Sequence, residues 1–149
     1  MKCLSRIADQ PRMKTFHNHL HHVHQGRQEM FRGQMVPCFE VPARLDQVLA
    51  RVRKQALGPV LEAPPRDPQA VHSPAYLQFL AGAWAEWVAM DPANAGRDAL
   101  PSVWPNQGLR SDVLPGNFAA RLGRHAFDSG SPLTAGTWAA ARHGADCAV

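Results

Sequence analysis

The stretch that decides the fold reads Gly33-Gln34-Met35-Val36-Pro37-Cys38-Phe39-Glu40-Val41-Pro42-Ala43-Arg44. Proline is tolerated at the first position of a helix, which is where Pro42 falls in this stretch. Apolar residues then follow at spacings of three and four: Leu45, Val48, Leu49 and Val52. This spacing predicts a helix with one apolar stripe, and the Gly58-Pro59 pair stops it.

A second helix is predicted further along the chain, where Ser73 supplies an N-cap and Pro74 fits the first helical position. One face of this helix is apolar and should be buried. Its residues are Tyr76, Leu77, Leu80, Ala83, Trp84, Trp87 and Val88. The Asp91-Pro92 pair ends the helix.

The remaining elements are short. We predict strands at residues 15–19 and 60–61, and a further helix after Pro132, from residue 134 to the chain end. Residues 93–117 show no sustained period and predict a long irregular loop, which is usually functional or disordered. With 13 prolines and 11 glycines the elements are few, so we expect a thin core.

Size, charge and cysteine usage restrict the class of protein. A chain of 149 residues is normally one domain, and its net charge of +4 is scattered, so no nucleic-acid stripe is visible. No window approaches the roughly 18 apolar residues of a membrane-spanning helix, so no membrane partner is expected. Cys3, Cys38 and Cys147 lack a Cys-x-x-Cys pairing, which favours a reducing, cytoplasmic location.

Three blocks carry a family resemblance in order along the chain. They are Gln28-Glu29-Met30-Phe31-Arg32-Gly33-Gln34-Met35-Val36-Pro37-Cys38-Phe39-Glu40, then Val71-His72-Ser73-Pro74-Ala75-Tyr76-Leu77-Gln78-Phe79-Leu80, then Phe127-Asp128-Ser129-Gly130-Ser131-Pro132-Leu133-Thr134-Ala135-Gly136-Thr137-Trp138. Together the blocks resemble the acetylpolyamine amidohydrolases, the bacterial branch of the arginase/deacetylase superfamily that includes histone deacetylases. Wider deacetylases tend to carry a His-Pro pair where this chain has Cys38-Phe39, which fits the polyamine branch better.

The resemblance implies a fold and a domain organisation. The fold class would be α/β: the helix-dominated amino-terminal part of a three-layer α/β/α parallel-sheet deacetylase fold, with a long irregular loop. Residues 1–12 would form an amino-terminal extension, and residues 13–149 a partial domain truncated before the zinc site.

The resemblance also implies a chemistry. In the family, Zn²⁺ held by two aspartates and a histidine polarises an acetyl carbonyl and activates water, and the substrates are small acetylated amines. These groups lie on Arg-Pro-Pro-Gly-His-His, Asp-x-Asp-x-His-His-Gly and Gly-Gly-Tyr segments, none of which occurs in this sequence. We therefore expect no catalytic residue, no specifically bound zinc and no turnover from this chain alone.

Two charged residues are candidates for a substrate entrance. Glu29 lies in a block that matches the family, where a carboxylate would attract a polyammonium substrate; the alternative is an exposed loop acid. Arg44 is the second candidate, because the matching arginine of deacetylases lies beside an internal channel. Glu40 and Arg44 flank Pro42, and we expect them to form a buried or semi-buried ion pair with a structural role.

Five of the eight histidines fall within residues 17–24. On an extended segment His17, His19 and His21 would project to one side and could bind Zn²⁺, Ni²⁺ or Cu²⁺ adventitiously. The alternative is a partly exposed loop after the first strand. We do not assign His21-His22 as the catalytic pair, because the family pair follows a glycine after several strands.

The irregular loop at residues 93–117 is the predicted interface. An exposed tryptophan in an aperiodic segment often anchors a partner, which makes Trp104, Pro105 and Arg110 candidates and predicts a homo-oligomer through this loop.

Tyr76 is the single tyrosine, but its helical spacing favours a place in the core over a role as oxyanion donor. Two alternatives to the hydrolase fragment stay open: a noncatalytic interaction module and a histidine-rich metal-binding protein.

Overall fold

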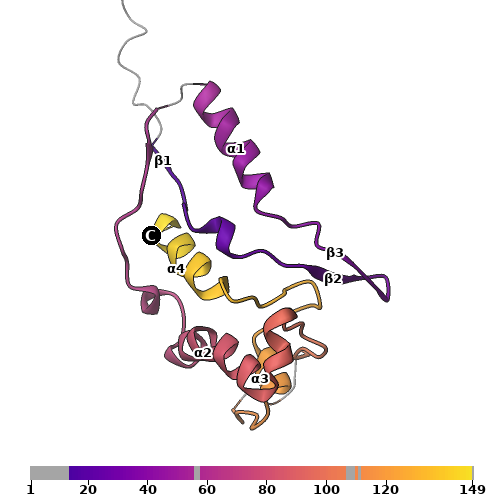
Figure 1. Ribbon diagram of the computed structural model, residues 1–149. Helices are drawn as coiled ribbons and strands as arrows, with labels where there is room; N and C mark the ends of the chain where they lie inside the picture. Colours follow the sequence, from indigo (N-terminus) through magenta and orange to yellow (C-terminus); the bar gives the residue numbers. More distant parts are fainter. Residues whose placement is uncertain (1–13, 56–57, 107–109, 111, 149) are drawn as a thin grey trace, which may run out of the picture.

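The computed structural model describes residues 14–55, 58–106, 110 and 112–148 (Figure 1). The predicted amino-terminal extension, residues 1–12, lies outside the described residues. The elements in chain order are β1 (Thr15–Phe16), η1 (His21–Val23), β2 (Gln28–Phe31), β3 (Gln34–Pro37), α1 (Ala43–Lys54), β4 (Val60–Leu61), η2 (Pro68–Ala70), α2 (Pro74–Met90), η3 (Pro92–Gly96), α3 (Phe118–Arg124) and α4 (Thr137–Ala148).

The strands of the described residues form two small sheets. β1 and β4 pair in parallel, with Thr15 opposite Val60 and Phe16 opposite Leu61, which agrees with the α/β class expected for this chain. β1 is shorter than the strand predicted at residues 15–19, because the chain turns into η1. β2 and β3 form an antiparallel hairpin that periodicity did not predict. Its two turn residues, Arg32 and Gly33, both have positive φ angles, as a type I′ hairpin turn requires.

The two long helices begin within one residue of the predicted positions. Pro42 is the N-cap of α1 and not its first helical residue, so α1 begins at Ala43, one residue later than predicted, and runs to Lys54. The Ser73 side chain caps α2 by accepting a hydrogen bond from the amide of Tyr76 at 3.3 Å. α2 ends before Asp91, whose carboxylate accepts from the amide of Ala93 at 2.9 Å and so begins η3.

The core lies between α2, α3 and a backbone pairing of two loops. Its buried side chains are Ala83, Ala99, Phe118, Leu122 and Leu133, with Phe79, Leu80, Trp84 and Trp87 packed against them. Ala99 and Leu133 exchange backbone hydrogen bonds of 3.0 and 2.9 Å, which closes the core from the side of the irregular loop. No large side chain of the described residues is fully buried, so the core is thin, as expected.

α4 packs against the segment around η1, near the other end of the described chain. The predicted helix after Pro132 is present as α4, and in Figure 1 it lies beside η1. The Asn18 side chain donates to the carbonyl of Ala140 at 2.8 Å, and the buried Asp146 carboxylate accepts from the amide of Arg66 at 2.7 Å. At Gly136 a Cβ atom would overlap the backbone carbonyl of Val23, so only glycine allows this close approach.

Candidate functional site

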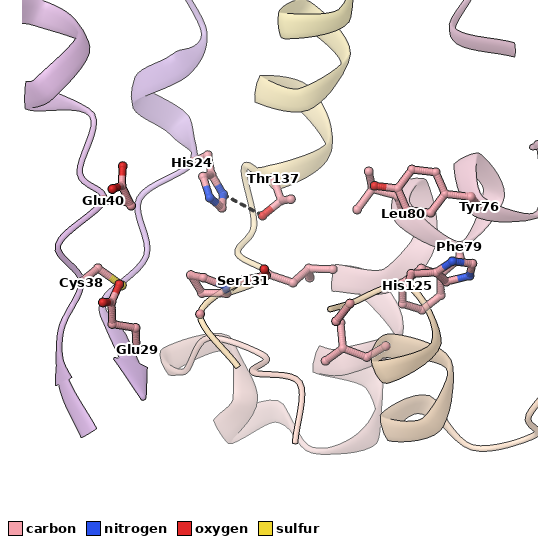
Figure 2. Close-up of a pocket in the computed structure, with 15 residues that line it drawn as sticks. His24, Glu29, Cys38, Glu40, Tyr76, Phe79, Leu80, His125, Ser131 and Thr137 are labelled. Atoms are coloured by element: carbon pink, nitrogen blue, oxygen red, sulfur yellow. Dashed lines mark hydrogen bonds between the residues drawn. The ribbon is translucent and has the colours of Figure 1, made fainter. Parts of the chain in front are cut away.

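A cavity of about 310 Å³ lies between the β2–β3 hairpin, α2, α3 and the segment before α4. Figure 2 shows its lining in three parts: acidic and thiol side chains from the hairpin, a histidine and threonine pair in the middle, and an aromatic wall from α2 and the end of α3. The residues labelled there are His24, Glu29, Cys38, Glu40, Tyr76, Phe79, Leu80, His125, Ser131 and Thr137.

Gly26 allows the hairpin wall to lie close to the segment around Pro132. A Cβ on the buried Gly26 would lie 2.7 Å from the Cys38 sulfur and 2.8 Å from Pro132 Cγ, so a larger residue would force the wall away. Glu29 accepts a hydrogen bond from the amide of Phe39 at 3.3 Å. Burial, together with the nearby Glu29 carboxylate, raises the pKa of the Cys38 thiol, so this cysteine is protonated at neutral pH.

The middle of the cavity contains a hydrogen-bonded pair. His24 Nδ1 lies 2.9 Å from Thr137 Oγ1, which also accepts from the amide of Thr134 at 2.7 Å. Burial lowers the pKa of His24, although the Asp98 carboxylate opposes this shift. His24 is therefore an uncharged imidazole at neutral pH, held in place by the amino-terminal end of α4.

The opposite wall is aromatic. The His125 ring stacks on Phe79 at a centroid distance of 5.0 Å and lies 5.1 Å from the Tyr76 ring. Burial lowers the pKa of His125, and the adjacent Arg124 lowers it further, so His125 behaves here as a neutral aromatic ring. Tyr76 is half-buried and lines the cavity, which is compatible with the predicted role in packing.

The structure separates the two predicted entrance residues. Glu29 lines the cavity, whereas Arg44 lies on α1 and lines a different groove. Arg44 pairs with Glu40, as predicted, but their side chains are 59% and 78% exposed. The prediction of a buried or semi-buried pair was therefore wrong, because no described element covers these two side chains.

The predicted histidine cluster does not form one side of an extended segment. The chain turns after His17, and His21 begins η1. His19 Nδ1 lies 3.5 Å from Glu62 Oε1, and His21 Nε2 lies 3.1 Å from Asp46 Oδ1, so the rings face different partners. Nowhere in the described parts of the chain do three His, Cys, Asp or Glu side chains form a group that could hold a metal ion. The residues described here therefore do not fit the zinc that the family implies.

The three interface candidates lie together on the irregular loop. Trp104 is 48% exposed, and it lines a second cavity of about 400 Å³ with Pro105 and Arg110. The Arg110 guanidinium donates to Asp112 at 2.9 Å, which lowers the pKa of that carboxyl. Within the described ranges, no helix is both long and apolar enough to cross a membrane.

Sequence reasoning did not predict the cavity. His24 and His125 lie in no resemblance block: they directly follow η1 and α3, far apart in the chain, and share no motif. The available signal was that most of the other lining residues fall within the three resemblance blocks, such as Glu29 in the first, Phe79 in the second and Thr137 in the third.

Comparison with known proteins identifies relatives along nearly the whole chain, although no protein-family model matches it. Acetylpolyamine amidohydrolase 2 of Pseudomonas aeruginosa is 42% identical over 142 residues, which cover 92% of this chain and 40% of the relative. Acetylpolyamine amidohydrolase 1 of the same organism is 42% identical over 134 residues, which cover 87% of this chain and 38% of the relative.

A solved structure supports the same relationship. The crystal structure of acetylpolyamine aminohydrolase from Burkholderia pseudomallei matches with a TM-score of 0.75 and 29% identity. The match covers 90% of this chain and 38% of that chain. The chain thus spans about 40% of the length of the curated relatives it matches. With 42% identity along 92% of its length, it belongs to the acetylpolyamine amidohydrolase family.

Proposed function

We propose that this chain is the amino-terminal part of a zinc-dependent hydrolase that removes acetyl groups from acetylated amines. The observation that carries the proposal is the 42% identity to a protein named acetylpolyamine amidohydrolase 2 along 92% of this chain. The three ordered sequence blocks support it; they cover the hairpin with the residues after it, the start of α2 and the segment that leads into α4. A partial domain at residues 13–149 and a cytoplasmic location remain predictions.

Catalysis would require residues beyond those of this chain. Zn²⁺ chemistry needs a set of ligands and an activated water. The described residues contain no group that could hold a metal ion, and the zinc motifs of the family do not occur in the sequence. We therefore propose that the chain alone neither binds zinc specifically nor hydrolyses acetylated amines.

The proposed contribution of the chain is the wall of a substrate entrance. Glu29 contributes a carboxylate to one side of the cavity, and the ring of Phe79 contributes an aromatic surface to the other. An ammonium group with an aliphatic body suits such a lining, because the carboxylate attracts the charge and the ring contacts the methylene groups. Arg44 lies outside this cavity and is a weaker candidate.

The decisive assay measures acetate release from a mono-acetylated diamine by the purified, untagged chain, with added zinc and with a chelator. The expected result is no release above background under either condition, because the metal ligands are missing. The relative from Pseudomonas aeruginosa, assayed in parallel, is the positive control. Release that the chelator abolishes would contradict the absence of catalysis.

A noncatalytic role in oligomerisation is the second candidate function. It is favoured by the exposure of Trp104, which lines the second cavity with Pro105 and Arg110. A large aromatic side chain beside a cavity is a common anchor in protein interfaces. We propose that two copies of the chain associate through the loop at residues 93–117.

A further inference from the structure

The outer surface of α1 forms a groove of about 680 Å³ that no described element covers. Its apolar floor consists of Val41, Leu45, Val48 and Val52, and Arg44 and Arg51 lie at its rim; we call this the α1 groove. None of the residues of α1 is buried, and Val48 is 56% exposed. Figure 1 shows α1 standing apart from α2, α3 and α4.

The parallel strand pair of β1 and β4 also lacks a covering element among the described residues. β1 and β4 contribute two residues each, and Phe16 and Leu61 are 41% and 37% exposed. Parallel sheets are normally covered on both faces, and a two-stranded sheet is marginal by itself in water. An amphipathic helix beside such a pair is expected to pack on a larger sheet. The α1 groove and this strand pair therefore each expose apolar side chains that lack a partner among the described residues.

The charge of α1 argues against a second copy as the occupant of the groove. α1 carries four cationic side chains, Arg44, Arg51, Arg53 and Lys54, and one carboxylate, Asp46. Two copies of α1 would bring like charges together around an apolar contact, and such a contact is unfavourable. A partner with apolar residues and carboxylates at its edge suits the groove better.

The relatives indicate where such a partner comes from. The match to acetylpolyamine amidohydrolase 2 covers 40% of that relative, so the relative contains further polypeptide outside the matched segment. We propose that the α1 groove binds this remaining part of an acetylpolyamine amidohydrolase, also when it is supplied as a separate polypeptide. The proposal rests on the proposed function and adds a partner, which the groove would bind without a covalent link.

The test is co-expression of the tagged full chain with the part of the Pseudomonas aeruginosa relative outside the matched segment. Affinity capture and light scattering of the eluate should show a one-to-one complex. Val48→Asp should weaken the complex at least about tenfold, because it places a carboxylate on the apolar floor. Ala50→Asp, on the same helix but outside the lining of the groove, is the matched control and should leave the complex unchanged.

Arg51→Glu reverses the charge at the rim and should also weaken the complex, so the inference does not depend on one variant. Circular dichroism of the free variants checks that they fold like the wild type. Three results would overturn the inference. They are the absence of a complex, a homodimer of the chain in place of the one-to-one complex, and equal binding by Val48→Asp and Ala50→Asp. Acetate release by the complex reports separately on the proposed function, since binding is measured by mass.

Discussion

Replacing Phe118 by alanine tests whether the small cluster around α2 and α3 holds the chain together. Phe118 is 4% exposed, and its ring stacks on Trp87 at a centroid distance of 5.5 Å. Burial of a phenylalanine side chain contributes about 1.5 to 3 kcal/mol, and an aromatic pair adds about 0.5 to 1.5 kcal/mol. With the cavity left behind, Phe118→Ala should lower the free energy of unfolding by about 3 to 5 kcal/mol.

The assay is urea unfolding followed by tryptophan fluorescence, because the ring of Trp87 contacts the mutated site. Phe127→Ala is the matched control: the same side chain is removed where it is 80% exposed, so the change should stay within about 0.5 kcal/mol. If the two variants lose similar amounts, or if Phe118→Ala loses less than about 1 kcal/mol, burial in this cluster does not stabilise the chain as argued.

Three further predictions concern other parts of the molecule. Gly136→Ala should lower the free energy of unfolding by about 1 to 3 kcal/mol, because the new methyl group meets the backbone of Val23. Gly82→Ala in α2 is the control: its methyl group enters open space and should not destabilise the protein. Urea unfolding midpoints distinguish the two variants. Burial lowers the pKa of His24, so the folded state binds a proton at His24 less readily than the unfolded state does. The free energy of unfolding should therefore fall as the pH is lowered from about 7.5 to about 5.5, and His24→Gln should reduce that fall. A pH dependence of stability equal to that of the wild type would contradict the reasoning. If the loop at residues 93–117 mediates self-association, Trp104→Ala should shift the mass measured by light scattering toward the monomer, and an unchanged mass would exclude Trp104 as the anchor.

Local signals predicted the helices well. The apolar spacing after Pro42, the Ser73-Pro74 pair and the segment after Pro132 predicted α1, α2 and α4, and all three are present. Helix caps and periodicity act over a few residues, so they can be read from the chain directly. α3 was missed because it has seven residues, too few for a clear period, and its N-cap is Asn117, whose side chain accepts from the amide of Ala120 at 2.8 Å.

Contacts between distant segments could not be predicted in this way. The hairpin of β2 and β3 has exposed apolar residues such as Met30 and Phe31 on its strands, so it lacks the alternation that identifies a half-buried strand. The expected ion pair of Glu40 and Arg44 was found, but its exposure depends on what packs against α1, which no local pattern records.

The sequence by itself determined the family, the three longest helices and the absence of the zinc motifs. Those properties follow from residue identities and from interactions within a few positions along the chain. Only the tertiary structure decided the cavity, because His24 and Thr137 are 113 positions apart and meet only when α4 packs beside η1. It likewise separated Glu29 from Arg44 and gave His19 and His21 different partners. Such contacts arise from packing of whole elements, and their residues share no spacing that a sequence pattern could reveal.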